Sequence, residues 1–149
     1  MYKLTAAEEF VKSFYPALDS NRSMISSFYS STPTNILFNG NQVADGNGVQ
    51  EIFVNQMPPS RYEAQSFDCQ VINRAYPTPT PSGEVKSPQE MTVKDMSFLV
   101  IVSGYAQYGS RGIDRNGFSE TFVLVPNPNP RPRQGTEWVI QSQNFRLVA

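Results

Sequence analysis

The spacing of the apolar residues changes near Pro58, and this change limits the possible folds more than any other feature. Before it, most apolar residues recur every three or four positions, as on the buried face of a helix. After it, apolar and polar residues alternate over long segments, which is typical of strands with one buried face. Helices followed by strands predict an α+β fold, with the helices packed on one face of an antiparallel sheet.

Three helices are expected before Pro58. Thr5 and Glu8 have the spacing of a capping box, which predicts the start of the first helix. Pro16 lies inside this helix, where it breaks or kinks the hydrogen-bond ladder. Asn21 lies in the turn that follows and is expected to cap the second helix. The helices are expected at about residues 5–19, 21–29 and 48–56.

Strands are expected on both sides of the third helix. Asn39-Gly40 is a strong signal for a tight hairpin, here between residues 35–38 and 42–44. Gly104 predicts a bulge or bend, because glycine weakens a strand interior. The longer strands are expected at residues 62–76, 92–108, 118–125 and 137–148.

Two proline-rich stretches, at about residues 77–91 and 126–135, separate these long strands. Their composition is typical of loops, so we expect insertions between paired strands of a single domain that spans residues 1–149. A polyproline ligand for an aromatic groove is the alternative interpretation.

Charge and hydropathy exclude two classes of protein. Twelve Lys and Arg residues oppose 13 Asp and Glu residues, which leaves a formal net charge of −1. This balance argues against a chain that binds nucleic acid mainly through the phosphate backbone, which requires many cationic contacts. The longest apolar run, residues 98–102, is far shorter than the roughly 20 residues that cross a bilayer, so no membrane partner is expected.

The chain contains few residues suited to catalysis. It has no histidine, which is the commonest general base and the commonest zinc ligand. Its single cysteine, Cys69, cannot form an internal disulfide, which suits a reducing compartment, and lacks a histidine to activate it. No metal-ligand cluster or glycine-rich nucleotide motif is found. We therefore expect no cofactor, no metal and no enzymatic activity.

The order of elements resembles the nuclear transport factor 2 (NTF2) fold, and several local sequences strengthen the likeness. Residues 10–22 resemble the first helix and turn of that family, and residues 117–124 resemble its penultimate strand. Trp138 with residues 144–147 resembles its last strand. The resemblance implies a cone in which three helices pack on a strongly curved antiparallel sheet.

Two further segments resemble the small subunit of the mRNA export receptor within that family. Phe38-Asn39-Gly40-Asn41 resembles its Trp-Asn-Gly-Asn hairpin, and Phe67-Asp68-Cys69-Gln70 resembles its Asp-Cys-Gln strand. The resemblance implies a non-enzymatic adaptor that heterodimerises with the NTF2-like domain of the large mRNA export receptor. The complex would shuttle between nucleus and cytoplasm through nuclear pores, with Phe-Gly nucleoporins bound mainly on the partner's half.

The resemblance also implies which residues meet the partner, because this family dimerises through the convex face of the sheet. Arg146 is expected to pair with a partner aspartate, and Asp68 with a partner arginine. By pattern alone, a solvated sheet face is the alternative. The residues placed on this face are Asp68, Gln70, Ile101, Ser103, Ser119, Thr121, Asn144 and Arg146.

Two other functions are open within the family. The homodimeric transport factor carries acidic residues for Ran binding on the loop that corresponds to residues 109–116, but this loop has one acid and two arginines, so Ran binding is not expected. Arginines in the loops can instead contact RNA in the assembled complex, or remain solvated; these are Arg111, Arg115, Arg131 and Arg133.

Ketosteroid isomerase and scytalone dehydratase share the fold and work inside the cone. The candidates for such chemistry here are Tyr15, Tyr29, Asp45 and Glu120. Since buried Tyr and Glu side chains also serve as structural hydrogen-bonding groups, we favour a structural role for these residues.

Overall fold

The computed structural model describes residues 2–74, 76, 93–109, 115–128 and 137–148. Most of the proline-rich stretches at 77–91 and 126–135 lies outside the described residues, as do Arg111, Arg131 and Arg133. The elements in chain order are α1 (Tyr2–Ser20), η1 (Arg22–Phe28), β1 (Asn35–Phe38), β2 (Asn41–Gln42), α2 (Gly46–Asn55), β3 (Ser60–Asn73), η3 (Val93–Asp95), β4 (Ser97–Tyr108), β5 (Arg115–Pro126) and β6 (Trp138–Val148).

The six strands form one sheet in the order β2-β1-β6-β5-β4-β3. Strands β3, β4, β5 and β6 pair antiparallel with one another in that order, as predicted. The sheet is mixed rather than wholly antiparallel, because β1 runs parallel to β6. These two strands lie far apart in the sequence, so no tight turn imposes an antiparallel pairing on them.

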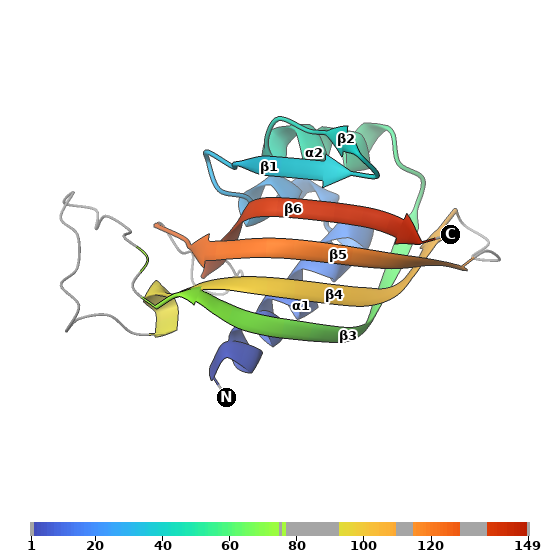
Figure 1. The fold of residues 1–149 in the computed structure, drawn as a ribbon. Helices are drawn as coiled ribbons and strands as arrows, with labels where there is room; N and C mark the ends of the chain where they lie inside the picture. The colour runs from blue at the N-terminus through green and yellow to red at the C-terminus, as the bar shows by residue number, and fades with distance from the viewer. Residues whose placement is uncertain (1, 75, 77–92, 110–114, 129–136, 149) are drawn as a thin grey trace.

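The helices lie on one face of the sheet and leave the other face open, as Figure 1 shows. The predicted α+β class and the packing of the helices on one face are thus confirmed. Two details differ from the prediction. Helix α1 begins at Tyr2, so Thr5 lies within the helix rather than at its cap. The second helix is a 3-10 helix, and the Asn21 side chain makes no cap hydrogen bond.

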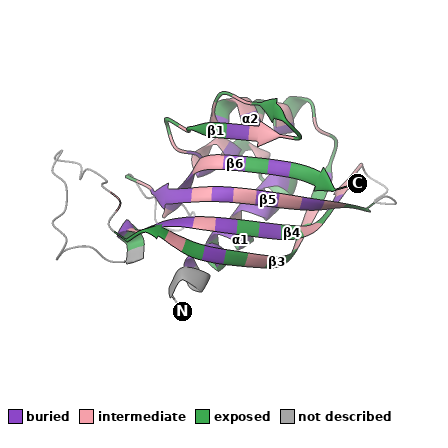
Figure 2. Ribbon diagram, viewed as in Figure 1, coloured by how far each residue is buried: buried purple, intermediate pink, exposed green. Residues whose placement is uncertain are grey.

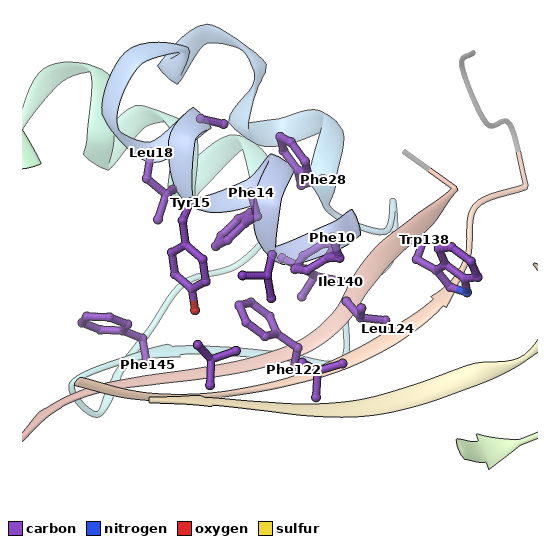
Figure 3. Close-up of a cluster of buried hydrophobic side chains, with 14 of the residues drawn as sticks. Phe10, Phe14, Tyr15, Leu18, Phe28, Phe122, Leu124, Trp138, Ile140 and Phe145 are labelled. Carbon is purple, nitrogen blue, oxygen red and sulfur yellow. The ribbon is translucent and has the colours of Figure 1, made fainter. Parts of the chain in front are cut away.

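Aromatic side chains fill the space between α1 and the sheet (Figure 3). Phe10 and Phe14 stack on α1 with ring centroids 5.4 Å apart, and Phe14 meets Phe122 of β5 edge to face, also at 5.4 Å. Such pairs contribute stability beyond the apolar area they bury. Along β4 and β5, buried residues alternate with more exposed ones, as Figure 2 shows.

Arg22 ties the helices to the start of β3. Arginine carries five N–H donors, and all five are used here at distances of 2.6 to 3.0 Å. Two of the acceptors are carbonyl oxygens in the last turns of α1 and α2, where a cation also interacts favourably with the helix dipole. The accepting residues are Leu18, Phe53, Met57, Pro58 and Ser60.

Gly104 faces a bulge in the neighbouring strand, as predicted. The pairing of β3 with β4 shifts between Ala64 and Ser66, and Gly104 pairs with Ala64. A Cβ atom at position 104 would lie 1.9 Å from the carbonyl oxygen of Glu63. Only glycine allows β3 to approach so closely at this position.

Candidate partner-binding face

The residues predicted to meet a partner lie together on the open face of the sheet. Three neighbouring rows of cross-strand partners contain all of them. We call these rows the outer face; they are Asp68, Ile101, Thr121 and Asn144, then Ser66, Ser103, Ser119 and Arg146, then Gln70, Leu99, Val123 and Ser142.

The alternate residues of the same strands point into the core, which shows that the outer face is the side away from the helices. Val100 and Val102 on β4 are buried, whereas Ile101 between them is 41% exposed. Leu99 and Val123 beside it are half-buried. The centre of the outer face is therefore apolar and its surroundings are mostly hydroxyl and amide side chains.

Arg146 and Asp68 carry the opposite charges of the outer face, on β6 and β3 respectively. Two strands separate them, which corresponds to about 14 Å across the sheet. Within the described part of the chain, the Arg146 guanidinium makes no ion pair or side-chain hydrogen bond. The Asp68 carboxylate accepts a hydrogen bond from the backbone N–H of Cys69 at 2.9 Å. Both charges are exposed, so each is accessible to a group on another molecule.

The catalytic candidates instead form a buried hydrogen-bonded chain on the inner face. Glu120 is 1% exposed, and its two oxygens accept hydrogen bonds from the Tyr15 hydroxyl and the Gln143 amide, each at 2.6 Å. Tyr29 donates its hydroxyl to the Gln143 carbonyl at 2.5 Å. Figure 3 shows the Tyr15 hydroxyl directed from α1 toward the sheet. Asp45 is not part of this chain, because its Oδ1 accepts from the Gly48 N–H and caps α2.

Burial is the dominant influence on the ionisation of this chain. It raises the pKa of Glu120 to about 7, although the hydrogen bonds from Tyr15 and Gln143 oppose the shift. Burial also raises the pKa values of Tyr15 and Tyr29, with the nearby Glu120 adding to the effect. The tyrosines therefore stay protonated as donors, and the arrangement holds α1, η1, β5 and β6 together.

The role of Gln143 as the link between Glu120 and Tyr29 was not foreseen from the sequence. Beside it, a β-bulge changes which of the preceding residues of β6 face inward. The pairing of β5 with β6 shifts so that Val123 pairs with Ser142 but Leu124 pairs with Ile140. Gln141 is the additional residue, and its amide donates to the Thr32 carbonyl at 3.0 Å. Strict alternation along β6 would place Val139 on the same side as Gln143, and the bulge places them on opposite sides.

Beside the outer face, at the end of the sheet where β4 meets β5, lies a cavity of about 200 Å³. Arg115 was expected in a loop, but it begins β5 and points to the Glu63 carboxylate, to which its Nη2 donates at 2.7 Å. The same guanidinium lies 4.9 Å from the centre of the Tyr105 ring. The residues that line the cavity are Arg61, Glu63, Tyr105, Gln107 and Arg115.

Among the described residues, Asp, Glu and Cys side chains form no cluster of three or more potential metal ligands. No helix there has the length and apolar character needed to span a bilayer.

The sequence of the chain assigns it to a family. Residues 6–147 match the nuclear transport factor 2 (NTF2) domain, and the chain belongs to this family. It is 30% identical over 142 residues to NTF2-related export protein 1 of Bos taurus, covering 95% of this chain and 86% of that protein. It is 26% identical to NTF2-related export protein 2 of Homo sapiens, covering 95% and 84%.

Solved structures share the fold over nearly the whole chain. A chain of the complex between the Chaetomium thermophilum Mex67 NTF2-like domain and Mtr2 has a TM-score of 0.80 and 24% identity, and 99% of each chain is covered. The structure of Mtr2 has a TM-score of 0.78 and 23% identity, covering 99% of this chain and 100% of that one. The predicted NTF2-like cone and the resemblance to the small export subunit are thereby confirmed.

Proposed function

We propose that this protein is a non-enzymatic adaptor subunit, which heterodimerises with the NTF2-like domain of a large mRNA export receptor and supports mRNA export through nuclear pores. Its similarity to NTF2-related export proteins and to Mtr2 supports this function. The observation that carries the proposal is the outer face, which combines an apolar centre with two accessible opposite charges.

The composition of the outer face supports a role as an interface. Specific interfaces have an apolar centre surrounded by a polar rim. Leu99, Ile101 and Val123 lie side by side on adjacent strands and supply such a centre. Serine, threonine and asparagine side chains around them supply hydrogen-bonding groups without the desolvation cost of buried charges.

The two charges give the proposed interface its specificity. Arg146 can form a planar, bidentate pair with a carboxylate and keeps its charge when water is removed. Asp68 offers the complementary acceptor at the opposite side of the sheet. A partner with an acid opposite Arg146 and a base opposite Asp68 would bind in only one register.

The buried chain around Glu120 supports the non-enzymatic part of the proposal. Each carboxylate oxygen of Glu120 already accepts a hydrogen bond from a side chain of the same molecule. A general acid or base must instead lie within hydrogen-bonding reach of a substrate. Asp45, the other carboxylate candidate, serves as the cap of α2.

The same proposal has three further parts. The chain is a single domain over residues 1–149. The complex shuttles between nucleus and cytoplasm, and it binds Phe-Gly nucleoporins mainly through the partner.

A homodimer is the second candidate, because the exposed apolar centre of the outer face can also pack against the same surface of a second copy.

The test is the mass in solution of the chain alone and with the NTF2-like domain of the large export receptor from the same organism. Light scattering during gel filtration should show self-association of the isolated chain, because the apolar centre of the outer face is uncovered. With the partner it should show a one-to-one complex. A monodisperse monomer at high concentration that does not combine with the partner would refute the proposed function.

A further inference from the structure

The cavity beside the outer face has an unbalanced charge. The described residues that line it include two arginines and one glutamate, whose formal charges sum to +1. Arg115 is balanced by Glu63, with which it forms an ion pair at 2.7 Å. Arg61 has no ion pair or side-chain hydrogen bond in the described part of the chain. Its guanidinium is therefore available to an anion that enters the cavity.

The register of the strands explains how the cavity forms. Arg61, Gln107 and Arg115 lie in one row across β3, β4 and β5, and Glu63 pairs with Tyr105 in the adjacent row. The residue opposite Tyr105 on β5 is Gly117, which has no side chain. Arg115 therefore lies against the Tyr105 ring. This contact and the ion pair of Arg115 with Glu63 together hold one wall of the cavity in place.

We infer that this cavity receives one acidic side chain, an aspartate or glutamate of the heterodimer partner, which pairs with Arg61 beside the Tyr105 ring. The inference rests on the proposed function, because the cavity borders the row of the outer face that contains Ser66 and Ser103. It adds a second anchoring point to the interface, at the end of the sheet.

A single carboxylate fits the charge of the cavity better than a polyanion does. One negative charge neutralises Arg61 and leaves the Arg115–Glu63 pair intact. A nucleic-acid backbone would bring several phosphates toward the Glu63 carboxylate, and like charges at close range are unfavourable. The formal charge of the whole chain, −1, also opposes binding of a polyanion.

The test measures the affinity for the NTF2-like domain of the large export receptor by calorimetry, at low and at moderate salt. Arg61→Gln should lower the affinity about tenfold and make it less dependent on salt, because a charge pair at the interface is lost. Arg61→Lys should recover part of the loss, since an ammonium keeps the charge but not the planar fork.

Lys12→Gln is the matched control, because it removes one positive charge from α1, on the far side of the sheet. Lys12 forms an ion pair with Glu8 at the surface, so this variant should bind as the parent does. Equal affinity of Arg61→Gln and the parent, while Arg146→Glu fails to bind, would overturn the inference and leave the proposed function standing. No binding by the parent would refute both.

Two other results would also overturn the inference. If Arg61→Gln strengthens binding, the cavity receives a basic side chain instead. In a parallel measurement, a fluorescent single-stranded RNA oligonucleotide is titrated with the parent and with Arg61→Gln. Equal, weak binding is expected, whereas RNA binding that is lost in Arg61→Gln would assign the cavity to phosphate.

Discussion

The two faces of the same sheet are built from neighbouring residues but obey different constraints. On the inner face, Val100, Val102 and Phe122 are fully buried against the helices. On the outer face, Ile101 lies between the two valines and is 41% exposed. The inner residues are constrained by packing within this chain, whereas the outer residues are free to match another molecule. Substitutions should therefore separate stability from binding according to the face on which they lie.

The largest effect on stability is expected in the aromatic core. Phe14→Ala removes a ring that contacts Phe10, Phe28 and Phe122, and should lower the free energy of unfolding by about 3–5 kcal/mol. Urea denaturation followed by circular dichroism measures this change. Thr121→Ala on the outer face of the same sheet is the control and should change stability by less than about 0.5 kcal/mol. Similar losses for the two variants would contradict the distinction between the faces.

The buried Glu120 should make stability depend on pH. Its pKa is raised by burial to about 7 in the folded chain, from an ordinary value of 4.5. Between these two values the unfolded chain is ionised while the folded chain retains the proton. Stability should therefore fall as pH rises from 4.5 to 7, by up to about 3 kcal/mol, and change little above that range.

Glu120→Gln removes this titration while preserving the size of the side chain. The difference in unfolding free energy between parent and Glu120→Gln should grow in favour of the variant from pH 4.5 to pH 7. Other carboxylates titrate equally in both proteins and cancel in this difference. A difference that stays constant over the range would show that Glu120 ionises freely, and that the surrounding hydrogen bonds outweigh burial.

Arg22 should have a smaller effect, because it joins elements at the edge of the core. Arg22→Ala leaves the carbonyls of Phe53, Met57 and Pro58 without their donor, and should cost about 2 kcal/mol. Arg22→Lys should recover little, since an ammonium cannot reach acceptors in so many directions. Thermal unfolding of the parent and the two variants measures their order of stability. Full stability of Arg22→Lys would mean that charge alone is needed there.

Much of the fold could be predicted from the sequence, because the signals for turns, bulges and buried faces lie in short segments of the chain. The Asn39-Gly40 hairpin and the bulge at Gly104 were recognised from single residues with special backbone freedom, and Asn39 and Gly40 both have positive φ angles. The parallel pairing of β1 with β6 was missed, since it joins segments about a hundred residues apart. The 3-10 form of η1 was also missed. Serines in this segment favour local hydrogen bonds to the backbone, such as the one that the Ser27 hydroxyl donates to the Met24 carbonyl.

The outer face was predicted from alternation and resemblance, and the cavity was not predicted at all. Alternation shows which residues of one strand share a face, and the resemblance placed Ile101, Thr121 and Asn144 together before their pairing was known. The cavity depends on the register of three strands at once, which brings Arg61 of β3 to Arg115 of β5 across β4. The sequence around Arg115 has the composition of a loop, and this concealed its place in a strand.

The central claim is that the outer face binds the partner, and Arg146 tests it most directly. Arg146→Ala should weaken the complex with the NTF2-like domain of the large export receptor by about 2–5 kcal/mol, mostly through faster dissociation. Arg146→Lys should recover part of this loss, because it keeps the charge without the bidentate geometry.

The decisive measurement is the affinity of Arg146→Glu for that domain, with circular dichroism of the isolated variant to confirm its fold. The reversed charge would meet the partner's carboxylate, so binding should be abolished while the helices and the sheet stay intact. If Arg146→Glu binds the partner as tightly as the parent does, Arg146 is a solvated residue near the end of β6 and the outer face is not the interface.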